Sequence, residues 1–159
     1  MKHLLKTVSI AFFAVVILSC EEEIKVKPVV EVPKVIFEAT LSGAKETPSN
    51  TSTETGSANL NFNTDTKRFT VVVTSTLGRL DSGGKPISRP LTMGHIHKGA
   101  QGENGSVVFT FVNLTSPITF VSDKLTPAQE ADLFAGLYYV NLHTAEFPAG
   151  EIRGNLVKK

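Results

Sequence analysis

The sequence has one cysteine, no tryptophan and four histidines among its 159 residues. A single cysteine excludes an internal disulfide and any zinc site built from a cluster of cysteines. Neither sign of charge dominates, since 16 Lys+Arg stand against 15 Asp+Glu and the net charge is +1. A near-neutral chain has no general electrostatic attraction for nucleic acid, so we expect no nucleic-acid partner.

The sequence also lacks an apolar run long enough to cross a bilayer, which takes about 20 residues. Its longest apolar run, Val8–Leu18, has 11 residues and is interrupted only by Ser9. Lys2 and Lys6 precede the run and give its N-terminal side a positive charge. Short length and positive flank are typical of a signal peptide, which we assign to residues 1–19.

The signal peptide runs directly into the only cysteine. The residues Ile17–Cys20, Ile-Leu-Ser-Cys, resemble the lipobox of bacterial lipoproteins, although Leu18 departs from the usual small or β-branched residue. The resemblance implies that the Cys20 thiol carries a diacyl anchor of palmitate type, and two acyl chains hold a protein stably on a membrane. We therefore predict a lipoprotein of the bacterial cell envelope, at the outer membrane or cell surface. The alternative is an ordinary secreted protein with a free thiol.

Residues 20–34 are predicted to tether this anchor to a folded domain. They mix charged residues with Pro28 and Pro33 and show no helical apolar face, as in an extended linker. Glu21–Glu23 resemble an export signal of surface lipoproteins, or are a solvated part of the tether. The single folded domain is assigned to residues 35–159.

The domain is predicted to be all-β. Thr, Val and Ile, at 17, 17 and 8 residues, make up about a quarter of the chain and favour strands. Alternating apolar and polar residues predict eight strands, over 35–41, 58–62, 68–77, 91–97, 106–112, 118–121, 137–144 and 151–157. The fifth and sixth of these read as a hairpin around 113–117. This pattern favours an antiparallel sandwich or closed barrel.

One short helix interrupts the strands. Thr126 is placed as its N-cap, Pro127 as its first residue and Gln129 as the partner in a capping box. Gly136 ends it.

Three histidines of the domain fall in predicted strands. His95 and His97 flank Ile96, so both project from the face opposite to that isoleucine. His143 alternates in the same way with Leu142. Imidazole is the commonest metal-ligating side chain, and this trio is a candidate site for copper or zinc. The alternative is three surface histidines that hydrogen-bond to loops.

Glu151 and Arg153 are weaker candidates for ligand contact. They flank Ile152 and share the face opposite to it, where they form an ion pair with each other or bind an anion. No nucleophile stands with a histidine and an acid at a recognisable spacing, so we expect no enzyme activity beyond a metal site.

Blocks of sequence spread over the whole domain resemble the chordin-type, or CHRD, domain family. The first is Phe37-x-Ala-x-Leu-Ser-Gly-x-x-Glu46-x-Pro48, and the second is Gly94-His-Ile-His-Lys-Gly99. The third is Leu137-Tyr-Tyr-Val-Asn-Leu-His143-Thr144, followed by Pro148-Ala-Gly-Glu-Ile-Arg-Gly154. The resemblance implies an immunoglobulin-like β-barrel of about eight strands and supplies no activity.

Two functions from different classes follow from these observations. One is a lipid-anchored, non-enzymatic module that binds an unknown protein or glycan at the envelope. The other is a copper- or zinc-binding or redox protein that uses His95, His97 and His143. The His-x-His pair is similar to the copper-binding pair of copper/zinc superoxide dismutases, but no zinc-ligand cluster accompanies it.

Overall fold

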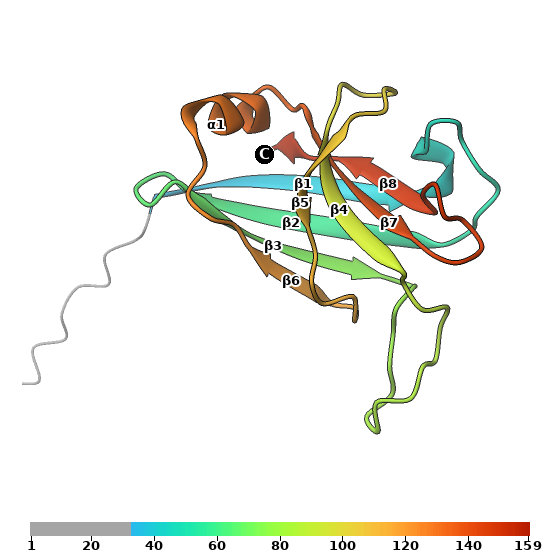
Figure 1. The fold of residues 1–159 in the computed structure, drawn as a ribbon. Helices are drawn as coiled ribbons and strands as arrows, with labels where there is room; N and C mark the ends of the chain where they lie inside the picture. Colours follow the sequence, from blue (N-terminus) through green and yellow to red (C-terminus); the bar gives the residue numbers. More distant parts are fainter. Residues whose placement is uncertain (1–32) are drawn as a thin grey trace, which may run out of the picture. The chain divides into compact units, whose positions relative to one another are not determined.

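The computed structural model describes residues 33–159 (Figure 1). Within these residues the chain forms nine strands and one α-helix, which confirms the all-β prediction. The strands are β1 (Lys34–Ser42), β2 (Thr55–Asn63), β3 (Arg68–Ser75), β4 (Met93–Lys98), β5 (Ser106–Thr110), β6 (Ile118–Val121), β7 (Tyr138–His143), β8 (Ile152–Asn155) and β9 (Val157–Lys158). A 3-10 turn, η1 (Gly43–Lys45), follows β1, and the helix is α1 (Pro127–Phe134). Among these described residues, no helix has the length and apolar character needed to cross a membrane.

The strands form one curled antiparallel sheet in the order β5-β4-β7-β8-β1-β2-β3-β6, with β9 beside β1. In Figure 1, β4, β5 and β7 cross in front of β1, β2 and β3, so the sheet folds over itself as a half-barrel. Its inner face carries the apolar residues of the alternating pattern. Phe37, Leu60, Val71, Ile96 and Leu142 all have exposed fractions of 0–1% and belong to one core.

β5 and β6 are the two edge strands, and the predicted hairpin between them is wrong. β5 pairs with β4 and β6 with β3, so the segment between them passes from one end of the sheet to the other. Aromatic packing accounts for this route: Phe109 lies edge-on to Phe69 at 5.1 Å, and Phe111 lies 5.6 Å from Phe120. Apolar contact between the edges thus replaces the hydrogen bonds of a hairpin.

The single strand expected over 151–157 is divided into β8 and β9. Leu156, fully buried, lies between them in the core. β8 also runs very close to β1, because a Cβ at Gly154 would lie 2.3 Å from the Thr40 carbonyl oxygen. Only glycine allows that approach.

The helix begins with the capping box predicted for Thr126 and Gln129. It covers one end of the core: Leu133 is fully buried, and Phe134 lies edge-on to Phe37 at 5.5 Å and to Phe62 at 5.6 Å.

The outer face of β7 is also covered. All six residues of β7 are buried, including the outward-facing Tyr139, Asn141 and His143. Three loops lie over this face, spanning 43–54, 99–105 and 144–151. Between these loops and the sheet lies a layer of buried polar side chains, separate from the apolar core, and this layer contains the candidate site.

Candidate functional site

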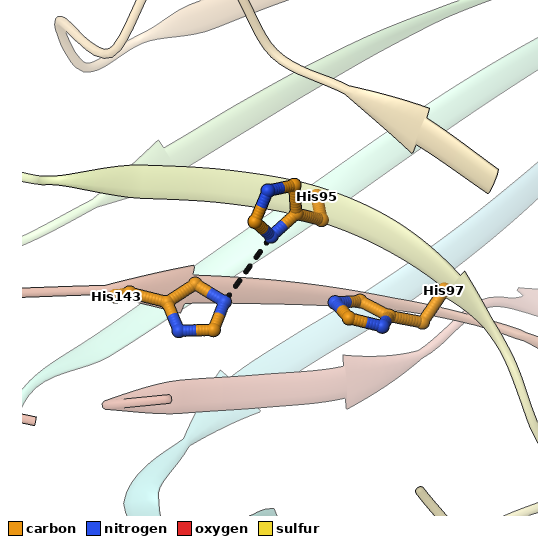
Figure 2. Close-up of side chains that lie close together, drawn as sticks. All are labelled: His95, His97 and His143. Carbon is orange, nitrogen blue, oxygen red and sulfur yellow. Dashed lines mark hydrogen bonds between the residues drawn. The ribbon is translucent and has the colours of Figure 1, made fainter. Parts of the chain in front are cut away.

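The structure brings the three predicted histidines together on the outer face of neighbouring strands. β4 pairs with β7 so that His95 lies opposite Asn141 and Met93 opposite His143. One ring nitrogen from each histidine lies within 4.8 Å of the other two. Figure 2 shows the rings of His95 and His143 turned toward each other and that of His97 beside them. A site built from all three histidines requires that their strands be neighbours in the sheet, and the sequence alone could not show this.

The strand faces are as predicted, but these are not surface histidines. Ile96, Val140 and Leu142 are fully buried on the inner face. On the outer face His143 is only 6% exposed, and His95 and His97 are half-buried. The covering loops, rather than solvent, surround much of the cluster.

Backbone carbonyl groups fix the orientation of two rings. His97 Nδ1 lies 2.9 Å from the Gly105 carbonyl oxygen, and His143 Nδ1 lies 3.0 Å from that of Pro148. A carbonyl oxygen only accepts, so each Nδ1 carries the proton and each Nε2 keeps a lone pair. Metal-ligating histidines are held in this way, with the second ring nitrogen donating to a carbonyl or carboxylate.

The remaining nitrogens converge within the cluster. His95 Nδ1 lies 3.2 Å from His143 Nε2, and the tautomer of His143 makes His95 the donor (Figure 2). His97 Nε2 is buried and has no hydrogen-bond partner among residues 33–159. An unpaired buried lone pair is costly unless a ligand satisfies it.

The surroundings of His95 and His143 favour their neutral forms by lowering their pKa values. Burial lowers the pKa of His95, and the neighbouring His143 and His97 lower it further. Burial also lowers the pKa of His143, although its bond to the Pro148 carbonyl acts in the opposite direction. Neutral imidazole is the form that binds a metal ion.

The spacing of the three nitrogens suits a small transition-metal ion. Zinc–nitrogen bonds of about 2.0–2.1 Å in a tetrahedral site place ligand atoms about 3.4 Å apart. The His95–His143 pair already has this separation, and the third nitrogen lies within 4.8 Å of both. Small ring rotations would bring all three into contact with one ion. Three ligands would leave a fourth position open.

Comparison with known proteins agrees with the sequence blocks. The model of the CHRD domain family matches residues 37–156. The chain belongs to the CHRD domain family. No curated protein and no solved structure matches it significantly.

Arg153 of this CHRD domain is fully buried, and it does not pair with Glu151. Its guanidinium carbon lies over the Tyr139 ring, 3.5 Å from the centroid, and His97 stacks on the ring with 4.9 Å between centroids. Arg153 also donates to Asn104 Oδ1 and to the Glu103 carbonyl oxygen, at 3.1 and 2.5 Å. The predicted ion pair is therefore wrong, because adjacent loops supply other partners. Arg153 holds the 99–105 loop that orients His97.

Glu151 of the CHRD domain is the centre of a separate network. Its fully buried carboxylate pairs with Arg89 and accepts hydrogen bonds from Ser52 and Thr144, at 2.8 and 2.5 Å. Arg89 also pairs with Glu146, whose side chain is exposed. This network anchors the 144–151 loop whose Pro148 carbonyl orients His143.

Sequence reasoning missed Glu46 and Asn141. Asn141 Nδ2 donates to Glu46 Oε2 over 3.4 Å, and both side chains are at least 91% buried. Burial raises the pKa of Glu46 to about 7, although the charge of Arg153 and the Asn141 hydrogen bond lower it. Glu46 was visible in the first CHRD block, but its burial depends on how the 43–54 loop folds over β7.

We expect Glu46 to make the stability of the domain pH-dependent. Its pKa of about 7 exceeds the value of 4.5 for a free side chain, so the folded state binds this proton more tightly. The stabilisation is therefore complete below pH 4.5 and is lost as pH rises through 7. On lowering pH from 7.5 to 5.5, wild type should gain about 2 kcal/mol relative to Glu46→Gln.

Urea unfolding of both metal-free proteins at the two pH values measures this difference. The lowered pKa values of His95 and His143 destabilise the folded state as pH falls below 6.5, but they act equally in both proteins. Parallel pH profiles for the two proteins would contradict the assignment of a neutral Glu46.

Proposed function

We propose that this CHRD domain is an envelope-anchored module that binds one copper or zinc ion through His95, His97 and His143. The observation that carries the proposal is the buried Nε2 of His97, which has no hydrogen-bond partner in the described part of the chain and lies near two further imidazole nitrogens. The ligands would be His97 Nε2, His143 Nε2 and His95 Nδ1, the last after its proton moves to Nε2 of the same ring and the His95–His143 hydrogen bond is given up. The proposal gives the binding module a definite ligand.

The arrangement favours a metal ion over a purely structural histidine cluster. A structural cluster satisfies its nitrogens internally, whereas the described part of the chain offers His97 Nε2 no partner. Both carbonyl bonds also leave the Nε2 atoms, rather than the Nδ1 atoms, free to bind. Neutral imidazoles without a thiolate suit copper and zinc better than hard cations such as magnesium or calcium.

Substitution of His97 should abolish metal binding. Metal analysis after dialysis against copper or zinc should find about one ion per wild-type chain and none in His97→Phe. Phenylalanine keeps a flat ring against Tyr139, so the variant removes the nitrogens and retains the stacking. At a free ion concentration of about 100 Kd, the ion should stabilise wild type by about 2.7 kcal/mol.

Tyr139→Phe is the matched control, because it keeps the stacked ring and all three ligands and removes only the hydroxyl that accepts from the Gly105 N–H. It should bind the ion stoichiometrically. If copper and zinc change the unfolding temperature of wild type no more than that of His97→Phe, the metal site is refuted.

We further propose that acylated Cys20 anchors the module, a residue outside the part of the chain that the structure describes. Wild type expressed in bacteria should partition into the detergent phase of a Triton X-114 extraction. Cys20→Ser should appear as unprocessed precursor or in the aqueous phase, because the hydroxyl cannot accept the lipid through a thioether. Aqueous partitioning of wild type would refute the anchor.

A further inference from the structure

Unpartnered polar atoms gather beside the three histidines. Six buried side-chain nitrogen and oxygen atoms lack a hydrogen-bond partner within residues 33–159. Three of them are His97 Nε2, Asn141 Oδ1 and Glu46 Oε1. Buried polar atoms are almost always paired, so a local group of exceptions indicates a missing ligand. A metal ion bound by the histidines would give His97 Nε2 a partner, but it would leave Asn141 Oδ1 and Glu46 Oε1 without one.

The two oxygens lie next to the histidine cluster. Asn141 is directly opposite His95 in the sheet and two residues from His143 on the same face. Side chains directly opposite each other have Cβ atoms about 4.5–5.5 Å apart. Glu46 reaches the same place from the 43–54 loop, through its bond to Asn141.

Gly150 packs directly against the two side chains, and the loop can approach them because this residue has no Cβ. A Cβ at this position would lie 2.8 Å from Glu46 Oε1 and 2.8 Å from Asn141 Oδ1. Gly150 belongs to the same loop as Pro148, whose carbonyl oxygen orients His143. Its backbone has a φ of 137°, so both the conformation and the close approach to the two oxygens require glycine here.

The chemistry of the two oxygens is complementary. Glu46 Oε2 accepts the Asn141 hydrogen bond, so a proton on this carboxyl belongs on Oε1. Burial raises the pKa of Glu46 to about 7, and near neutral pH a large fraction of the molecules has this proton. Oε1–H then donates, while Asn141 Oδ1 accepts. A small molecule that both accepts and donates, such as water or a peroxide, satisfies both.

We propose that Glu46 and Asn141 are positioning residues that hold, by hydrogen bonds, a small oxygen ligand at the open fourth position of the metal. This inference rests on the proposed function, because it requires an ion on the three histidines. It assigns the exogenous ligand to the class of water, hydroxide and peroxide. A second cation is disfavoured, since the buried Arg153 guanidinium lies near enough to act on Glu46.

Azide binding to the copper(II)-loaded domain at pH 6 tests the proposal. Azide takes an open copper position, produces a charge-transfer absorption band, and accepts a hydrogen bond. Glu46→Leu, which removes the donor, should weaken azide binding about tenfold. Glu46→Gln retains an N–H donor and should stay within about threefold of wild type. Asn141→Ala, which frees Glu46 from its orienting bond, should weaken azide binding at least about threefold.

The copper affinity of all three variants should remain within about threefold of wild type, because the ligands are intact. Glu130→Leu is the matched control, since this carboxylate lies on α1 and pairs with Lys67, outside the three loops that cover the histidines. It should leave azide binding unchanged. If Glu46→Leu does not fold, Asn141→Ala carries the test.

Three results are decisive. Failure of wild type to bind either copper or zinc would refute the proposed function itself. Copper binding without any azide band would show that the fourth position is closed, which refutes this inference alone. Azide affinities within twofold of wild type in both Glu46→Leu and Asn141→Ala would also refute it. The expected pattern is weak binding in these two and recovery in Glu46→Gln.

Discussion

Arg153→Ala is expected to lower the free energy of unfolding by about 3–5 kcal/mol, as large buried truncations do. The side chain is fully buried, stacks on Tyr139 and ties the 99–105 loop to the sheet by two hydrogen bonds. Its removal leaves a cavity beside the Tyr139 ring, and the Glu103 carbonyl oxygen loses its hydrogen-bond donor. Urea unfolding of the metal-free protein measures the loss.

Arg153→Lys should recover only part of this stability. Lysine keeps the charge, but it lacks the planar fork that stacks on an aromatic ring while donating two directed hydrogen bonds. A loss below about 1 kcal/mol in Arg153→Ala would mean that the loop is held by other contacts. Both variants should also loosen His97, since the same loop carries the Gly105 carbonyl that orients it.

Ile96→Ala should cost about 2–4 kcal/mol, the second large effect. Ile96 is fully buried at the centre of β4, with Val140 opposite it on β7 and Phe109 on β5. Alanine would leave a cavity that these strands cannot close without breaking their register. Met93→Ala, in the same strand but 42% exposed, should change stability by less than about 0.5 kcal/mol.

The comparison of Ile96→Ala with His97→Ala tests the assignment of the strand faces. In metal-free protein, His97→Ala should cost less, because His97 is half-buried and contributes one stack and one hydrogen bond. The reverse order of the two losses would contradict the packing described here.

Alternation along each strand was enough to predict the all-β class and the faces of His95, His97 and His143. The period of two is a local property, and it requires no knowledge of neighbouring strands. The pairing of β4 with β7, which brings the three rings together, is long-range and could not be read from that pattern. The CHRD blocks placed the histidine segments in one domain but not in one sheet position.

The errors have the same physical origin. The hairpin assigned around 113–117 assumed that successive strands pair, whereas aromatic residues such as Phe109 and Phe120 join opposite sheet edges. The pair assigned to Glu151 and Arg153 assumed that neighbours on one face meet. Loops distant in sequence supply their partners instead, as Arg89 does for Glu151. Burial of Glu46 likewise depends on loop closure, which has no periodic signal.

The orientation of His97 and His143 by the carbonyl oxygens of Gly105 and Pro148 has a consequence for how this site varies. Every residue type carries a carbonyl oxygen, so most exchanges of side chain in the two loops leave the imidazoles correctly aimed. Gly105 is an exception, because a Cβ there would lie 1.6 Å from the Lys98 carbonyl oxygen. Insertion or deletion of one residue, by contrast, moves the acceptor itself. The site is thus tolerant of changes in loop composition and intolerant of changes in loop length.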